Sequence, residues 1–443
     1  MLTPPTILRT SAAVALALLA SACASYHPLP LPTVPTQIQA QAQTPVPAGP
    51  LSADQIAVLV LRDNPDLMAA RRQKGVAQAQ LLQAGLLPDP SFSGALLPLL
   101  AGPGDTLQWS AVVQEDLRAL ITLKARKQGA QAAARQVDAQ LLWQEWQAVG
   151  QARLLCAQIT AGDRALKVLV DTRDLLAERA RRLQGALEQG NATLAVSAPD
   201  LAALQAARGQ VDALERQQLQ RRHQLNAMLD REPDAPLELA ETSAAPEPHL
   251  AAIDVQAAGI AKRRPDLIAL RLGYQAQETR TRQAILMQFP ALSLGPGGGS
   301  DNSNVRNLGP EFTATVPIFD RNRGDIALQR ATREQLRAEY QARLDQAYAQ
   351  ARAAVTELRQ AQRQLAVLRT DLPGVRRAAD QAASALHAGA LDELGYVDLV
   401  SARLSKEAEI ITLEQTVQEQ EVALAVLTGA GLPSIDTLSD TAA

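Results

Sequence analysis

Aromatic side chains are scarce in this chain of 443 residues, of which Phe, Tyr and Trp together make up 3%. Large aromatic side chains dominate the burial energy of compact cores, so their scarcity argues against a series of compact globular α/β domains. Ala, Leu, Gln, Arg and Glu take their place, and these residues favour helices. The composition therefore predicts long helices that pack closely through small side chains.

Cysteine, histidine and surplus charge are also lacking. The chain has 2 Cys and 4 dispersed His, which excludes a zinc framework and predicts no resident metal. Its 43 basic and 46 acidic residues give a formal net charge of −3, so no basic face for nucleic acid is expected. No nucleophile, base and orienting group occur together. We therefore expect no catalysis and no cofactor.

The N-terminus has the features of a targeting segment. Residues 1–22 combine a basic residue, Arg9, with an apolar run over 11–20 that is shorter than the ~20 residues needed to cross a bilayer. Residues 19–23 resemble a bacterial lipobox, which implies that Cys23 becomes the lipidated first residue of the mature protein. Ala24 resembles the address of an outer-membrane lipoprotein. The alternative is a simple secretory signal in which Cys23 has no role.

Residues 23–50 are rich in proline and almost free of charge, which predicts a lipid-anchored, extended tether. The remainder contains an internal repeat, whose landmarks recur in one order about 200 residues apart. These landmarks include Pro65 and Pro265, Pro88 and Pro290, Gly190 and Gly389, and Asp200 and Asp398. They indicate two units, 51–232 and 250–432, joined by a linker over 233–249 and followed by a tail over 433–443.

Each unit follows one plan of helix, two strands, long helix, turn and helix. Ser52 and Gln55 fit a capping box, and Pro65 and Pro265 fit the first turn of a helix. Strands are predicted over 91–97 and 107–114 in the first unit, and over 291–294 and 312–318 in the second. Residues 295–299, which are mostly glycine, are expected to form a loop. Long helices are predicted over 120–188 and 324–388, and Pro373 is expected to bend or interrupt the second.

Shorter helices are predicted to return over 199–230 and 397–428. Two strands in each unit make four strands in each chain, and an open sheet of four strands cannot remain in lipid. Three chains would supply twelve strands, an even number within the range of bacterial barrels. If the strands cross a membrane, a trimer is the economical solution.

These features resemble the TolC family of trimeric outer-membrane efflux proteins. The resemblance rests on residues 64–67 and 264–267, on Pro88 and Pro290 before the strands, and on the repeat itself. It implies a mainly α-helical protein whose trimer forms a twelve-stranded membrane β-barrel on a long periplasmic α-helical tunnel. It also implies an outer-membrane exit duct for tripartite efflux pumps or type I secretion systems, lying mostly in the periplasm. The implied partners are outer-membrane lipid, two further copies, a periplasmic adaptor and an inner-membrane pump of the RND type.

Residues 316–324 most specifically resemble the strand-to-helix junction of the branch that serves heavy-metal pumps, and imply export of metal ions or small toxic compounds. Pro317 suits the end of a strand, Asp320 can cap the next helix, and Gly324 permits unusual backbone angles. The charged side chains can lie at the level of the lipid headgroups. The predicted junction residues are Pro317, Phe319, Asp320, Arg321, Asn322, Arg323 and Gly324. The alternative is an ordinary charged loop.

The turns between the long and short helices are the predicted periplasmic tips. The resemblance implies that they form the closed aperture and the docking place of the adaptor. Relative to the family, both turns, from Gly190 to Asp200 and from Gly389 to Asp398, look three or four residues longer. Asp398 and Ser401 fall where members have aperture residues, and a ring of Asp398 carboxylates would favour cations. The alternative, which is compatible, is that Asp200 and Asp398 cap the returning helices.

A lipid-anchored periplasmic coiled-coil scaffold or adaptor is the competing hypothesis, because long helices rich in Ala, Gln and Arg fit it equally well. The strands discriminate between the two readings. An adaptor would hold its β-structure in one separate block, whereas this sequence predicts one short strand pair in each unit.

Overall fold

A computed structural model of the protein describes residues 26–33, 49–101, 104, 106–191, 193–241 and 259–432. The chain divides into two units, residues 1–46 and residues 47–443. In the first, residues 26–33 are exposed and form neither helix nor strand. Cys23 and the signal segment lie outside the described residues. The remainder of this section concerns the second unit.

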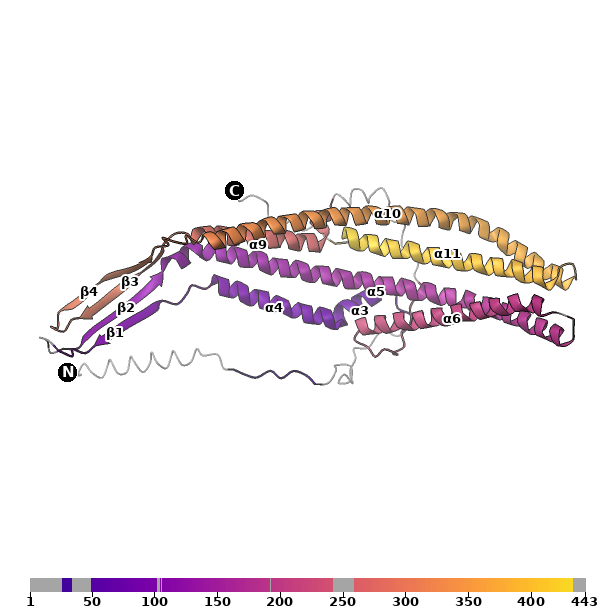
Figure 1. The fold of residues 1–443 in the computed structure, drawn as a ribbon, viewed down its shortest axis with the longest axis horizontal. Coiled ribbons are helices and arrows are strands. Elements are labelled where there is room, and N and C mark those ends of the chain that lie inside the picture. Colours follow the sequence, from indigo (N-terminus) through magenta and orange to yellow (C-terminus); the bar gives the residue numbers. More distant parts are fainter. Residues whose placement is uncertain are drawn as a thin grey trace. The chain divides into compact units, whose positions relative to one another are not determined.

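The same order of elements occurs twice (Figure 1). The first set is α3 (Ala53–Asp63), α4 (Pro65–Gly85), β1 (Ser91–Leu97), β2 (Gln108–Asp116), α5 (Leu117–Glu188) and α6 (Leu194–Met228). The second set is α8 (Ile260–Arg263), α9 (Pro265–Leu286), β3 (Ala291–Ser300), β4 (Arg306–Thr315), α10 (Arg323–His387) and α11 (Glu393–Thr428). The predicted tandem helix–strand–strand–helix repeat is confirmed.

The predicted helix starts are also confirmed. Ser52 accepts a hydrogen bond from the backbone N–H of Gln55 and the Gln55 side chain accepts from the N–H of Ser52, which completes the capping box of α3. Pro65 and Pro265 are the first residues of α4 and α9. Pro88 and Pro290 each lie between the end of one of these helices and the strand that follows.

The two long helices dominate the unit. α5 has 72 residues, which at 1.5 Å per residue is ~110 Å. α10 has 65 residues and continues through Pro373, so of the two expected outcomes, a bend or an interruption, the interruption does not occur. Leu368 and Leu372, just before Pro373, pack against Ile410 and Leu413 of α11, and this packing holds the helix together around the missing N–H. Among the described helices, none combines the length and apolarity that crossing a membrane requires.

The core is a series of small clusters between neighbouring helices. Ala139 of α5 packs with Ile268, Ala269 and Leu272 of α9, and further along α10 packs against α11 in the same manner. Gly150 of α5 lies so close to Val426 of α11 that a Cβ atom there would overlap it. Alanine and glycine therefore bring helix axes together, which explains why the chain needs few aromatic side chains.

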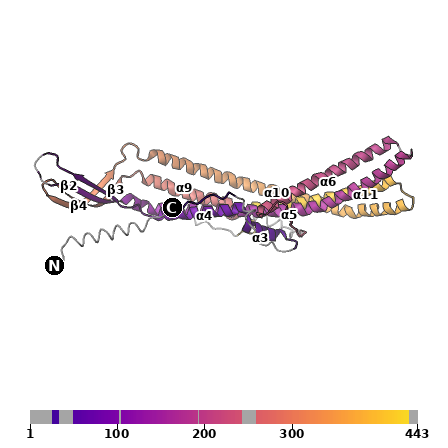
Figure 2. The same ribbon diagram turned by 90° about the horizontal axis from the view of Figure 1, so that it is seen from below.

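The four strands form one antiparallel sheet in the order β1-β2-β3-β4, beyond one end of the helices (Figures 1 and 2). The glycine-rich segment 295–299 belongs to β3 and pairs with β4 throughout, so the predicted loop is wrong. A Cβ atom on Gly299 would lie 2.5 Å from the carbonyl oxygen of Trp109 in β2. Glycine here permits close approach of neighbouring strands, which overrides its poor strand propensity.

Candidate channel-forming surfaces

One face of the sheet is apolar. Because side chains alternate along a strand, the register places even-numbered residues of β1, β3 and β4 and odd-numbered residues of β2 on one face. Its exposed members include Phe92, Leu96, Trp109, Val113, Leu292, Leu294, Leu308 and Phe312. A contiguous apolar surface of this kind is unfavourable in water and suits contact with lipid.

The opposite face is polar. It carries Ser93, Ser293 and Asn307, together with Gln114 and Thr313, whose side chains hydrogen-bond across the sheet at 3.2 Å. Gly295, Gly297 and Gly299 of β3 also lie on this face and add no side chains to it. The sheet therefore has one apolar face and one polar face, as a strand layer between lipid and water requires. Its edge strands, β1 and β4, have no partner within the described chain.

The junction after β4 is a loop over residues 316–322. β4 ends at Thr315, just before Pro317, as expected. Asp320 does not cap α10 through its side chain; instead its carbonyl oxygen accepts hydrogen bonds from the backbone and side chain of Arg323. Gly324 is an ordinary helical residue of α10. The expectations for Asp320 and Gly324 were therefore wrong.

The unusual backbone angles occur instead at Arg321 and Asn322, with φ of 49° and 55°. Asn322 is the N-cap residue of α10, and its side-chain amide donates to the carbonyl oxygen of Ala284 at the end of α9, at 2.8 Å. Sequence reasoning missed this role, although asparagine is among the few residues that tolerate the left-handed region. Phe319 remains in the loop with its side chain 90% exposed.

The equivalent junction of the first half has no loop. β2 ends at Asp116 and α5 begins at Leu117. The Asp116 side chain accepts a hydrogen bond from the N–H of Arg118 at 2.9 Å and so caps α5. The two halves therefore connect sheet and helix differently.

The two helix turns lie at the end of the helices opposite the sheet (Figure 1). Each turn has five residues, 189–193 and 388–392, and Gly190 and Gly389 adopt φ of 74° and 69°. Thr193 and Asp392 are the N-cap residues of α6 and α11. Asp200 and Asp398 therefore lie inside these helices, and the alternative that they act as caps is wrong. Leu194 and Glu393 begin these helices six and five residues before the two aspartates.

The two tips differ in their charges. Asp200 forms a bidentate ion pair with Arg179 of α5, with N–O distances of 2.7 and 3.0 Å, and both side chains are largely buried. In the second tip the equivalent arginine, Arg377, donates to the carbonyl oxygen of Pro373 instead. Asp398 is exposed and Ser401 lies half-buried one turn further along α11. Only the second tip thus presents its aspartate to solvent.

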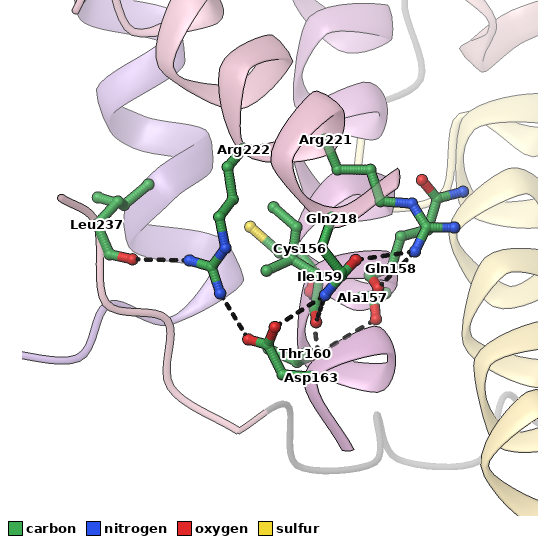
Figure 3. A network of polar contacts seen from close by, with 10 residues as sticks. All are labelled: Cys156, Ala157, Gln158, Ile159, Thr160, Asp163, Gln218, Arg221, Arg222 and Leu237. Atoms are coloured by element: carbon green, nitrogen blue, oxygen red, sulfur yellow. Dashed lines mark hydrogen bonds and ion pairs between the residues drawn. The ribbon is translucent and has the colours of Figure 1, made fainter. Parts of the chain in front are cut away.

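A partly buried polar network ties the C-terminal half of α6 to α5 (Figure 3). The side-chain amide of Gln218 packs against α5 and donates to the carbonyl oxygen of Ile159 and to the carboxylate of Asp163, both at 2.8 Å. Gly162 makes this possible, because a Cβ atom there would lie 2.5 Å from the Gln218 amide. Arg222 completes the network by donating to Asp163 at 2.7 Å.

Glu414 ties α11 to both long helices. Its carboxylate accepts hydrogen bonds from Arg164 of α5 at 2.8 Å and from Arg369 of α10 at 2.9 Å. Burial raises the pKa of Glu414, but the two arginines outweigh burial and hold that pKa below its usual value. The carboxylate therefore stays charged at neutral pH and keeps α11 between α5 and α10.

No group of His, Cys, Asp and Glu able to hold a metal ion occurs within the described ranges. Burial raises the pKa of the Cys156 thiol to about 12, so this thiol is not a reactive nucleophile. His387 lies near the second tip, where its ring bonds the carbonyl oxygen of Ala383. What the structure offers is a set of surfaces: a two-faced sheet, two tips and two long helical walls.

Residues 259–430 match the family model described as outer membrane efflux protein. No curated protein sequence matches the chain.

Similar solved structures show the same fold. The outer-membrane channel OprN is 18% identical, with a TM-score of 0.70 over 86% of this chain and 90% of that one. CusC is 16% identical, with a TM-score of 0.67 over 92% of this chain and 99% of that one. The open state of the outer-membrane channel MtrE from Neisseria gonorrhoeae is 15% identical, with a TM-score of 0.67 over 92% of this chain and 98% of that one.

Proposed function

We propose that the chain belongs to the outer membrane efflux protein family, whose model matches residues 259–430, and that it forms the outer-membrane exit duct of a tripartite efflux system. The observation that carries this proposal is the two-faced sheet at one end of helices of 72 and 65 residues. A sheet with one apolar and one polar face can line a water-filled passage through lipid, and the helices can extend that passage into the periplasm. The scaffold hypothesis gives no reason for such a sheet.

The internal repeat supports assembly with further copies. In the second half, α9 lies between α10, the long helix of its own half, and α5, the long helix of the preceding half. The positions of α9 that face α5 are buried to 6% exposure or less, and they are Ile268, Ala269, Leu272 and Ala276. The equivalent positions of α4 are all exposed, and they are Met68, Ala69, Arg72 and Val76.

A second copy can cover this face of α4. In the first half the preceding long helix would be α10 of a neighbouring copy. Gly129 and Ala139 of α5 contact α9, and 199 residues later α10 has Leu328 and Ala338, both exposed. The unpaired edges of β1 and β4 would be joined in the same ring. Three copies would close twelve strands, so we propose a homotrimer.

We further propose that the tips form the periplasmic aperture and meet an adaptor coupled to an inner-membrane pump of the RND type. Gly190 and Gly389 make these turns, and Asp398 with Ser401 lies on the second tip, where exposed carboxylates favour cations. The junction sequence, with Arg321 and Arg323 at the headgroup level, favours metal ions or small toxic compounds as cargo. Delivery to a type I secretion system is the alternative use of the same duct.

Channel formation can be tested directly. The purified protein is expected to migrate as a trimer that resists SDS, and to produce discrete conductance steps in a planar lipid bilayer. A protein that remains monomeric and never conducts would contradict the proposed function. Resistance to carbonate extraction from membranes separates an integral duct from a lipid-anchored scaffold.

Lipid anchoring is proposed from the lipobox-like residues 19–23. Radioactive palmitate is expected to label the wild type and to be absent from a Cys23→Ala variant, because Cys23 is the proposed acceptor. Cys156→Ala is the matched control and should retain full labelling, since that thiol is buried. Equal labelling of the wild type and Cys23→Ala would remove the lipoprotein assignment while leaving channel formation untouched.

A further inference from the structure

Charged residues are few in the four-stranded sheet. The four strands contain four charged residues, Glu115, Asp116, Arg306 and Glu311. Glu115 and Asp116 end β2 beside the helices, and Arg306 begins β4 at the far end. Glu311 is the exception, since it lies four residues before the end of β4, or about 14 Å along the strand.

The register decides which face Glu311 occupies. Phe312 pairs with Leu294 on the apolar face, so Glu311, paired with Gly295, lies on the polar face. A carboxylate within a membrane is tolerated where it faces a water-filled cavity, and such residues commonly mark the path of an ion. The placement of Glu311 therefore agrees with a lumen on the polar side of the sheet.

Glycines leave the carboxylate uncovered. The Glu311 side chain lies across Gly297, where a Cβ atom would overlap the carboxylate. Gly309, which pairs with Gly297, also adds no side chain to this surface. Glu311 itself is exposed and forms no ion pair with any residue that the structure describes. Its negative charge is thus directed at water rather than balanced by the protein.

We propose that Glu311 is a selectivity-determining residue, which makes the passage through the sheet prefer cations over anions. The inference rests on the proposed exit duct and narrows its cargo to positively charged ions or compounds. In the proposed trimer three Glu311 carboxylates face one lumen at the same depth, and rings of carboxylates favour cations. The glycine surface beside them keeps this part of the lumen wide while leaving the charge in place.

The test is the reversal potential of single channels in planar bilayers under a KCl gradient. Glu311→Gln is expected to lower the permeability ratio of potassium to chloride by about twofold or more at 0.1 M salt, and Glu311→Lys is expected to lower it further. Glu311→Asp should keep the wild-type ratio. Glu115→Gln is the matched control, because this residue lies on the apolar face at the base of β2 and should leave the ratio unchanged.

The difference between the wild type and Glu311→Gln should shrink at 1 M salt, where the Debye length falls to about 3 Å. A purely structural role for Glu311 would not produce this salt dependence. Trimers on SDS gels verify that each variant assembles. Conducting variants with an unchanged ratio in both Glu311→Gln and Glu311→Lys would overturn this inference alone, whereas a wild type that never conducts would overturn the proposed duct as well.

Discussion

A chain with Val76→Cys and Leu328→Cys is expected to form covalent dimers and trimers on oxidation, visible at two and three times the chain mass on non-reducing gels. The expectation comes from the repeat, because Val76 and Leu328 are equivalent to Ala276 and Gly129. Those two residues meet within one chain, where a Cβ atom on Gly129 would lie 3.9 Å from the carbonyl oxygen of Ala276. Helices that approach this closely bring Cβ atoms on their facing sides within the range that a disulfide can bridge.

The matched control pairs Val76→Cys with Val367→Cys. Val367 is also exposed on α10, but it lies 39 residues further along, or about 58 Å on a straight helix. The buried Cys156 should not compete. If both pairs cross-link equally, or if neither does, α4 does not receive α10 of a neighbour in the register proposed here.

Asp266→Ala is expected to lower the free energy of unfolding by about 3–5 kcal/mol, because it leaves the buried guanidinium of Arg264 without its counter-charge. Arg264 is 4% exposed, donates to both Asp266 oxygens at 2.8 and 3.1 Å, and stacks over Trp143 at 4.9 Å. Asp266 also accepts from the N–H of Leu267, so its loss leaves this N–H of the first turn of α9 without that partner.

Chemical unfolding in detergent, followed by circular dichroism, measures this effect. Asp138→Ala is the control, since it breaks an exposed pair with Lys74 at 3.1 Å and should cost less than about 1 kcal/mol. A double variant, Arg264→Met with Asp266→Leu, should recover most of the loss because it removes both buried charges together. An Asp266→Ala protein as stable as Asp138→Ala would show that the buried pair contributes little.

The order of elements could be predicted from the sequence because strong local signals mark their boundaries. Pro65, Pro265 and the Ser52 capping box fix helix starts through backbone chemistry that needs no tertiary context. Gly190 and Gly389 mark the turns for the same reason, since both adopt positive φ. Because most of these signals occur once in each half, the repeat supports each boundary a second time.

Features that depend on neighbouring elements could not be predicted. The glycines of β3 are held as a strand by pairing on both sides, and Pro373 is held in α10 by packing on α11. The pairing of Arg179 with Asp200, but not of Arg377 with Asp398, depends on side-chain directions that the repeat leaves open. The position of Glu311 on the polar face of the sheet likewise required the register of the four strands.

The unequal junctions give the two halves different mechanical roles. β2 passes directly into α5 with no residue between them. A rotation of the first long helix must therefore move the strand with it. Residues 316–322 separate β4 from α10, and a displacement of α10 can be taken up in this loop before it reaches β4. The helix pair of α10 and α11 can therefore shift relative to the sheet without displacing its strands, whereas a shift of α5 must displace β2.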